Sequence, residues 1–395
     1  MPSSRLSLRL GQLPHDVLAE LAAQLCSESP ALQAAAEECM ASHSPLLHEM
    51  VERVLLSPDL VPSILAQLGA EDGAAAGVCT QWLVGWKATS ESRRRLKQVP
   101  LDLPEELITG VKLKMTGTPD GRLVVDTGST VHILDRSMRV LQTAARSHYN
   151  LIAADDDSIF SSTADGTTLL RCTYDGTTVA EFELEGYSFG YGVLAPGNLL
   201  FTVVRHERTN EATDEYDYQP SEIIALDAQT LQLRHRFGRG LLDEIYPLPL
   251  AVAGDELYVC DSSCEGLESL EVFSFTGEHR RSVVGAWEQP KLLCSAKDRL
   301  YMVEHFYGCQ DGDFCEIPGV RLLVLSLQGD ILQAISLRQP TDRDASLGVH
   351  SICCFEGKLL VGGCYERFTV SKYYDAGDPT TFTEEKNTML ALRGL

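Results

Sequence analysis

Three segments in the second half of the chain combine aromatic and acidic side chains, a composition suited to binding basic peptides. They span residues 205–221, 305–319 and 365–387. Exposed aromatic rings with carboxylates nearby bind Lys and Arg side chains through packing, ion pairs and cation–π contacts. The alternative is that these segments are solvated loops whose rings pack back on the domain. The candidate target-binding residues are Tyr216, Tyr218, Phe306, Tyr307, Phe314, Tyr365, Phe368, Tyr373 and Tyr374.

Two acidic clusters resemble sites for Ca²⁺, which prefers several oxygen ligands. Residues 155–157 are all Asp, and residues 311–313 read Asp-Gly-Asp. Neither cluster has the spaced acids and terminal Glu of an EF-hand loop. We therefore interpret both clusters as turn residues and predict no metal ligand among them.

Pairs of cysteines raise the possibility of a metal or redox site. Three residues separate Cys260 from Cys264, and five separate Cys309 from Cys315. Zinc sites usually show tighter, repeated spacing, so we interpret these residues as unlinked thiols. The chain also lacks a Gly-x-Ser-x-Gly elbow and a Gly-rich phosphate loop. The sequence therefore predicts no catalytic, cofactor-binding or metal-binding residue.

The elements that must position the aromatic and acidic segments are short strands in a repeating pattern. Beyond residue 110 the hydrophobic period is two, and β-branched runs alternate with Gly, Asp and Asn turns. One run, at residues 121–126, recurs at residues 157–160, 197–201, 254–261, 297–303 and 356–361. Six units of about 47 residues match four-stranded propeller blades. A solenoid is the competing architecture, but its rungs are usually shorter and more regular.

The order of apolar strand, Asp, apolar strand and turn Gly resembles six-bladed propellers of the NHL type. The three aromatic and acidic segments fall between the second and third strands of their units, so we expect them on one rim of the ring. The last unit ends at Leu395 without a fourth strand. Residues 99–103 are expected to supply that outer strand and close the ring, the alternative being a three-stranded last blade.

The first 98 residues have helical periodicity instead. Within them, residues 57–86 read SPDLVPSILAQLGAEDGAAAGVCTQWLVGW, with a proline and an acid before Leu60 and a Val-Cys-x-x-Trp ending. This order resembles the F-box. The resemblance implies docking on a Skp-type adaptor within a cullin–RING ubiquitin ligase complex. The implied adaptor-binding residues are Leu60, Ile64, Leu65, Leu68, Val78 and Trp82.

Two features depart from the F-box pattern. Pro62 lies where that family usually has a helix-compatible residue, and residues 13–25 form a second, less complete match. Short helices of this kind present an apolar face to a partner. The alternative is that the same apolar residues simply pack against the propeller.

The charge of the chain argues against nucleic-acid and anionic-membrane partners. Its formal net charge is -23, whereas binding to phosphates relies on clustered Lys and Arg. No secretory signal or stretch of about 18–20 apolar residues is found. We expect a location in the cytoplasm or nucleus.

These observations predict an α+β multidomain protein. Residues 1–56 form a helical extension, residues 57–98 F-box-like helices, and residues 99–395 an all-β, six-bladed propeller. The predicted function is a non-enzymatic substrate receptor that binds a Skp-type adaptor and a protein target. The alternatives are a metal-dependent hydrolase of the lactonase or esterase type acting in the propeller channel, and a non-catalytic scaffold.

Overall fold

The structure is a computed structural model in which the chain divides into two compact units. One unit comprises Met1–Lys97 with Arg393–Leu395, and the other comprises Gln98–Leu392. Within the described parts of the chain, no helix is long and apolar enough to cross a membrane. The structure describes residues 57, 60–66, 68, 80–90, 94–99, 101, 103–107, 113–145, 150–210, 215–218, 221–242, 248–262, 268–306, 309–310, 313–314, 319–337, 345–368 and 382–395.

Six main sheets make up the larger unit, which confirms the six-bladed propeller predicted from the repeats. Blades 1 and 2 contain β2 (Lys114–Gly117), β3 (Leu123–Asp126), β4 (Thr130–Leu134) and β5 (Val140–Ala145), then β6 (Asn150–Ala154), β7 (Ser158–Ser162), β8 (Thr168–Thr173) and β9 (Thr178–Glu183). Blades 3 and 4 contain β10 (Tyr187–Ala195), β11 (Leu199–Asn210), β13 (Glu222–Asp227) and β14 (Leu233–Phe237), then β15 (Leu250–Ala253), β16 (Glu256–Ser262), β17 (Glu268–Ser274) and β18 (His279–Val284).

Blades 5 and 6 complete the ring. They contain β19 (Pro290–Ala296), β20 (Arg299–Phe306), β23 (Gly319–Ser326) and β24 (Ile331–Ser336), then β25 (Ala345–Phe355), β26 (Lys358–Phe368), β27 (Phe382–Arg393) and β1 (Lys97–Val99). Three further strands lie between second and third blade strands: β12 (Glu215–Tyr218), which pairs with β11, and the pair β21 (Cys309–Gln310) and β22 (Asp313–Phe314). A 3-10 turn, η2, spans Glu105–Leu107.

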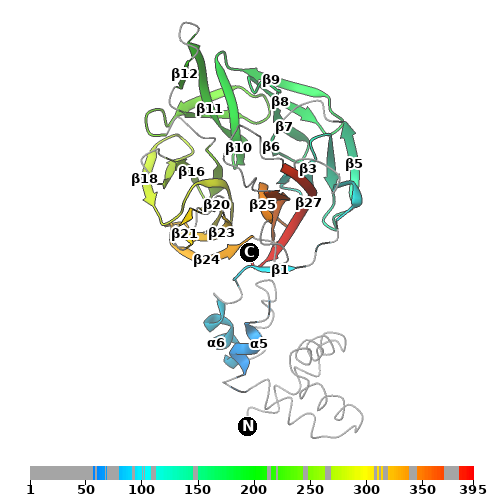
Figure 1. The fold of residues 1–395 in the computed structure, drawn as a ribbon, viewed down its shortest axis with the longest axis vertical. Coiled ribbons are helices and arrows are strands. Elements are labelled where there is room, and N and C mark those ends of the chain that lie inside the picture. The colour runs from blue at the N-terminus through cyan, green and yellow to red at the C-terminus, as the bar shows by residue number, and fades with distance from the viewer. Residues whose placement is uncertain are drawn as a thin grey trace. The chain divides into compact units, whose positions relative to one another are not determined.

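The first strand of each blade lies at the centre of the ring. β2, β6, β10, β15, β19 and β25 contact one another in cyclic order, and β25 returns to β2. The outer strands β5, β9, β18 and β24 lie on the rim in Figure 1. The propeller core therefore consists of apolar side chains packed between adjacent blades, as in the cluster of Leu226 with Phe160 and Leu169.

Strand β1 closes the ring by pairing with β27 as the outer strand of blade 6. The sequence predicted an outer strand from this part of the chain, but at residues 99–103. The observed strand lies two residues earlier and ends at Val99, directly before Pro100, which has no N–H to donate to a sheet. Leu101 and Leu103, beyond the strand, pack instead on the apolar cluster between blades 1 and 6.

A close approach of the chain accompanies this closure. Gly394, directly after β27, has a φ of 129°, and a Cβ built on it would lie 2.5 Å from the carbonyl oxygen of Arg95. Contacts this short do not occur for real Cβ atoms, so only glycine fits here. Residues that precede β1 and follow β27 thus run against each other.

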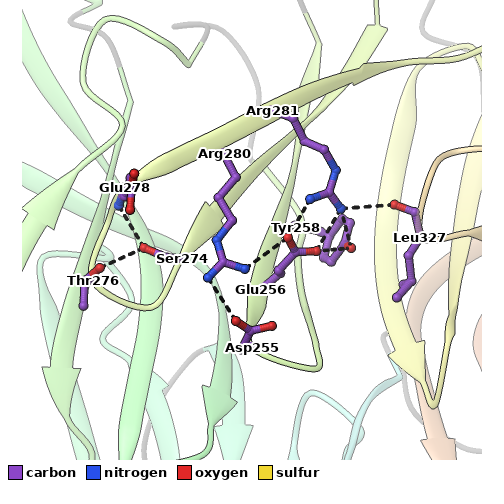
Figure 2. Close-up of polar contacts among 9 residues, drawn as sticks. All are labelled: Asp255, Glu256, Tyr258, Ser274, Thr276, Glu278, Arg280, Arg281 and Leu327. Atoms are coloured by element: carbon purple, nitrogen blue, oxygen red, sulfur yellow. Dashed lines mark hydrogen bonds and ion pairs between the residues drawn. The ribbon is translucent and has the colours of Figure 1, made fainter.

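An ion-pair network ties blade 4 to blade 5 (Figure 2). Arg281 on β18 reaches across β17 to β16, where its two terminal nitrogens lie 2.5 and 2.8 Å from the Glu256 carboxylate oxygens. The same guanidinium donates to the Tyr258 hydroxyl at 3.0 Å and to the carbonyl oxygen of Leu327, in blade 5, at 3.4 Å. Tyr258 in turn donates to Glu256 at 2.7 Å. Both terminal nitrogens of Arg281 and both carboxylate oxygens of Glu256 thereby have partners, as expected for a partly buried bidentate ion pair.

The network shifts the ionisation of its members. Hydrogen bonding from Arg281 lowers the pKa of Glu256 to about 2, although burial opposes this shift. Burial raises the pKa of Tyr258 to about 12. At the exposed edge, Arg280 binds Asp255 at 2.9 Å, but the Asp255 side chain is 80% exposed, so water screens that pair.

The described part of the smaller unit contains two helices, α5 (Val61–Leu65) and α6 (Thr80–Ala88). Their shared core consists of Val61, Leu65 and Trp82. Gly85 lets the helices approach closely, because a Cβ there would lie 2.8 Å from a Val61 methyl group. Pro62 is accommodated in the first turn of α5, where its missing N–H has no helical partner to lose. The helices predicted before residue 57 lie outside the described residues.

Candidate functional site

One end of the ring carries the inserted segments, and we call it the insertion end. Successive strands of a blade run in opposite directions, so the connection from the second to the third strand lies at the end where the first strand begins. This connection is short in blades 1 and 2 and long in blades 3, 5 and 6, as β12 and the β21–β22 pair indicate. The insertion end is therefore asymmetric, with its additional chain on blades 3, 5 and 6.

The predicted target-binding residues that the structure describes all lie at the insertion end. Phe306 is the last residue of β20, and Phe314 is in β22. Tyr216 pairs with Thr209 and Tyr218 with Glu207 in the extension of β11 by β12. Tyr365 and Phe368 lie in the last part of β26, whereas Tyr307, Tyr373 and Tyr374 lie outside the described residues.

The centre of the ring carries polar residues that the sequence analysis did not single out. Five of the six first strands carry a half-buried Lys, Asn, Tyr or His side chain, and one is taken from each strand: Lys114, Asn150, Tyr191, Lys291 and His350. We call this set the central polar ring. Lys114 and Asn150 are the first residues of β2 and β6, and the Lys114 ammonium donates to the Asn150 side-chain oxygen at 3.1 Å. This hydrogen bond joins blades 1 and 2 at the insertion end.

Three members of the central polar ring lie at β-bulges. Pairing between β19 and β20 skips Lys291, and pairing between β25 and β26 skips His350. In β10, the register shifts between Phe189 and Gly192, a segment that includes Tyr191. A bulged residue leaves the regular ladder and its side chain is re-aimed, a device often found beside functional sites.

The surroundings of Lys291 alter the ionisation of neighbouring groups. Burial lowers the pKa of Lys291, and the negative charge of Glu268 opposes that shift. The pKa of His305 is lowered by burial and then by the charge of Lys291. Burial also raises the pKa of Tyr191, and the neighbouring Cys260 adds to this effect. The Lys291 amine therefore lies close enough to the His305 imidazole and the Glu268 carboxylate for their charges to interact at the insertion end.

Asp155 of the first acidic cluster and Cys260 of the first cysteine pair have structural surroundings. The Asp155 carboxylate accepts backbone N–H groups of Asp157 at 2.9 Å and Ser158 at 2.6 Å, as expected for a turn residue. Cys260 is fully buried in the apolar cluster between blades 4 and 5. Cys264 and Cys315 lie outside the described residues.

The centre of the ring lacks the oxygen ligands that a bound metal ion would need among its described residues. Ca²⁺ requires several carboxylate or carbonyl oxygens around one point. None of the six first strands contains an Asp or Glu, and the described residues contain no group of three or more His, Cys, Asp and Glu that could hold a metal ion. The described residues therefore do not fit a Ca²⁺ cage.

The candidate adaptor-binding residues differ in how deeply their side chains are buried. Leu65 and Trp82 are buried in the core of the helix pair, while Ile64 and Leu68 are half-buried. Leu60, at the start of α5, is 45% exposed. Val78 lies outside the described residues.

Two further apolar side chains of the helix pair are exposed. Leu83 and Val84, on α6, are 38% and 61% exposed. The sequence analysis named neither residue, because it took Trp82 as the group presented to a partner. Helical geometry explains the difference, since residues one and two positions after a buried side chain turn away from the core.

No family model matches the sequence, and no curated protein matches it either. Among solved structures, a luciferin-regenerating enzyme is similar, with 12% identity, a TM-score of 0.48, and coverage of 76% of this chain and 96% of that one. A member of the DUF4221 family from Bacteroides vulgatus shows 11% identity, a TM-score of 0.45, and coverage of 76% and 98%. A calcium-binding protein, regucalcin, from Agrobacterium tumefaciens shows 13% identity, a TM-score of 0.44, and coverage of 73% and 92%.

Proposed function

We propose that this protein is a non-enzymatic receptor that binds an adaptor through its helix pair and a target through its propeller. The adaptor would be a Skp-type protein of a cullin–RING ubiquitin ligase. The receptor would contribute proximity between target and ligase, while catalysis belongs to other subunits.

The observation that carries this proposal is that some apolar residues of the helix pair are buried between the helices while others are exposed. Val61, Leu65 and Trp82 form a small core, while Leu83 and Val84 remain exposed on α6. A short helix pair that keeps exposed apolar groups after completing its own core is suited to dock on a second protein. The F-box-like order of residues 57–86 selects the Skp-type adaptor as that protein.

The insertion end supports the proposed binding of a target by the propeller. Repeat proteins bind their partners through loops that emerge on one face. Here the additional chain lies on blades 3, 5 and 6, and its sequence combines aromatic with acidic residues. A target segment that carries Lys or Arg would complement this composition.

Replacing exposed residues of α6 tests the adaptor interaction without disturbing the helix core. The double variant Leu83→Ser, Val84→Ser is expected to bind purified Skp-type adaptor about tenfold more weakly or worse, because two apolar contacts are lost. Isothermal titration calorimetry on the full-length protein measures the change. Trp82→Ala is less informative, since loss of a buried residue would unfold the helix pair itself.

The matched control replaces apolar residues of similar exposure on outer propeller strands. Val179 and Leu233 are 49% and 41% exposed, and the double variant Val179→Ser, Leu233→Ser should bind the adaptor like the unaltered protein. Absence of binding by the unaltered protein, or equal losses in both double variants, would contradict the adaptor proposal.

A hydrolase acting at the centre of the ring is the second candidate function. The observation in its favour is the proximity of Lys291, His305 and Glu268, whose pKa values or charges influence one another. Groups with shifted ionisation beside a ring centre are typical of acid–base sites.

Chromogenic esters and lactones test this candidate. If this candidate function is correct, the purified protein hydrolyses at least one of these compounds. The single variants Lys291→Met and His305→Gln should each reduce the rate about a hundredfold or more. Turnover that survives in both variants, or no turnover above a heat-inactivated sample with and without added Ca²⁺ or Zn²⁺, would count against the hydrolase.

A further inference from the structure

The described ionisable groups at the centre of the ring are mainly cationic, in contrast to the chain as a whole. The formal net charge is -23, yet the first strands contain two Lys and one His and no Asp or Glu. Lys114 is in blade 1 and Lys291 in blade 5, so the two ammonium groups come from the blades on either side of blade 6. His350 lies on the first strand of blade 6 itself.

Carboxylates next to this centre are largely paired within their own blades. Glu304 on β20 is fully buried and forms an ion pair with Arg321 on β23, and it accepts the backbone N–H of Glu288 at 2.6 Å. Glu222 on β13 forms an ion pair with Arg236 on β14. These pairs cancel two negative charges at the insertion end.

The remaining described carboxylates near Lys291 lie on blade 4. The charge of Glu268 acts on Lys291, and the charges of Glu268 and Asp261 act on the buried Cys260. Both residues are on blade 4, whereas Asp126 of blade 1 pairs with Lys114 in the β2–β3 ladder and accepts the backbone N–H of Gly128 at 2.8 Å. The first strands of blades 5, 6 and 1 thus carry the cations, and these carboxylates lie on neighbouring strands of blades 1 and 4.

The bulges give a second, independent indication of a ligand site. Regular pairing would place every first-strand residue in a ladder with its neighbour, but the register shifts at Tyr191, Lys291 and His350. Bulges occur where a strand re-aims a side chain. The pairing of β6 with β7 also skips a residue, the apolar Ile152, so four of the six first strands contain a bulge, and three of these four bulges include a polar side chain.

We propose that the central polar ring binds a small molecule with a carboxylate or phosphate group. Lys291 and Lys114 would supply charge, His350 a ring N–H, Tyr191 a hydroxyl, and Asn150 the amide that orients Lys114 through their hydrogen bond. Charge-assisted hydrogen bonds from several fixed donors are the usual basis of anion recognition. This site uses none of the candidate target-binding residues or helix-pair residues named above, and it does not depend on the proposed adaptor or target.

Titration of the full-length protein with two probes, succinate and inorganic phosphate, tests the site and distinguishes the two anionic groups. The unaltered protein is expected to bind at least one probe with saturation at low salt. Lys291→Met and Lys114→Met should each weaken that binding about tenfold or more, because each removes a charged donor. Lys291→Arg should lose much less affinity for the probe, since arginine keeps the positive charge.

Lys358→Met is the matched control. Lys358 is a half-exposed residue at the start of β26, and pairs with Phe355 at the end of the ring opposite the insertion end. Its replacement should leave probe binding unchanged. If Lys291→Met does not fold, Lys291→Arg and Tyr191→Phe are compared instead. Tyr191→Phe is expected to bind the probe about threefold more weakly or worse, because it lacks the hydroxyl. No saturable binding of either probe, or equal weakening in Lys358→Met, would overturn the proposal.

Discussion

A chain that begins at Leu101 is expected to melt about 10 °C below a chain that begins at Glu91. Only the longer chain retains β1, the outer strand of blade 6. Loss of β1 removes its hydrogen bonds to β27, at about 0.5–1.5 kcal/mol each, and the partial burial of Val99, for a total of about 3–5 kcal/mol. For a domain of this size each kcal/mol corresponds to about 2–4 °C. Differential scanning calorimetry of the two chains measures the difference.

The truncation also leaves the edge of β27 without a partner, so the shorter chain should aggregate more readily. A point variant separates closure from truncation. Gly394→Ala in the full-length protein should lower the melting temperature, because its new Cβ would meet the Arg95 carbonyl oxygen. Gly176→Ala is the control, since Gly176 also has a positive φ of 89° but has open space around its Cβ position. Equal melting temperatures for the two truncated chains would show that β1 does not stabilise the ring.

Replacing Glu256 with Gln is expected to remove about 2–3 kcal/mol of stability at neutral pH and to flatten the acid limb of the pH–stability curve. The folded-state pKa of Glu256 is about 2, against an ordinary value of 4.5. The folded state therefore favours the carboxylate. Its contribution is fully present above pH 4.5 and is lost as the pH falls through about 2. Since the Glu256 side chain is only 15% exposed and Arg281 is 36% exposed, part of the contribution survives solvent screening.

Urea unfolding at several pH values between 2 and 7 measures this effect. Asp255→Asn is the matched control, because Asp255 also binds an arginine of β18 but is 80% exposed. It should unfold like the unaltered protein throughout this pH range. A Glu256→Gln variant with unchanged stability at pH 7, or with the same loss between pH 4.5 and 2 as the unaltered protein, would show that the Arg281–Glu256 pair does not stabilise the fold.

Local sequence patterns were sufficient to predict the ring. Gly-rich turns and short apolar runs recur because each blade has the same second and third strands, which are buried on both faces, as in β3 and β7. The missing fourth strand of the last unit indicated closure from the N-terminal side. The predicted position of this strand, residues 99–103, differs from the observed Lys97–Val99, since the pattern did not weigh the effect of Pro100 on pairing.

The central polar ring could not be predicted in the same way. First strands differ widely, from the four residues of β15 to the eleven of β25, so no repeated run marks them. A bulge depends on the register with a partner strand, which a single sequence does not reveal. The Arg281–Glu256 pair is similar: 25 residues separate the two, and only the fold of blade 4 brings them into contact.

The pairing of β1 with β27 fixes an order of events during synthesis. The chain leaves the ribosome N-terminus first, so Lys97–Val99 emerges long before Phe382–Arg393. At typical elongation rates the interval is roughly 15–60 s. Residues 57–90, including both described helices, emerge before that interval begins, whereas the last blade cannot be completed until it ends. A nascent chain therefore passes through a period in which the helix pair has already been synthesised while the propeller remains an open arc, accessible to chaperones.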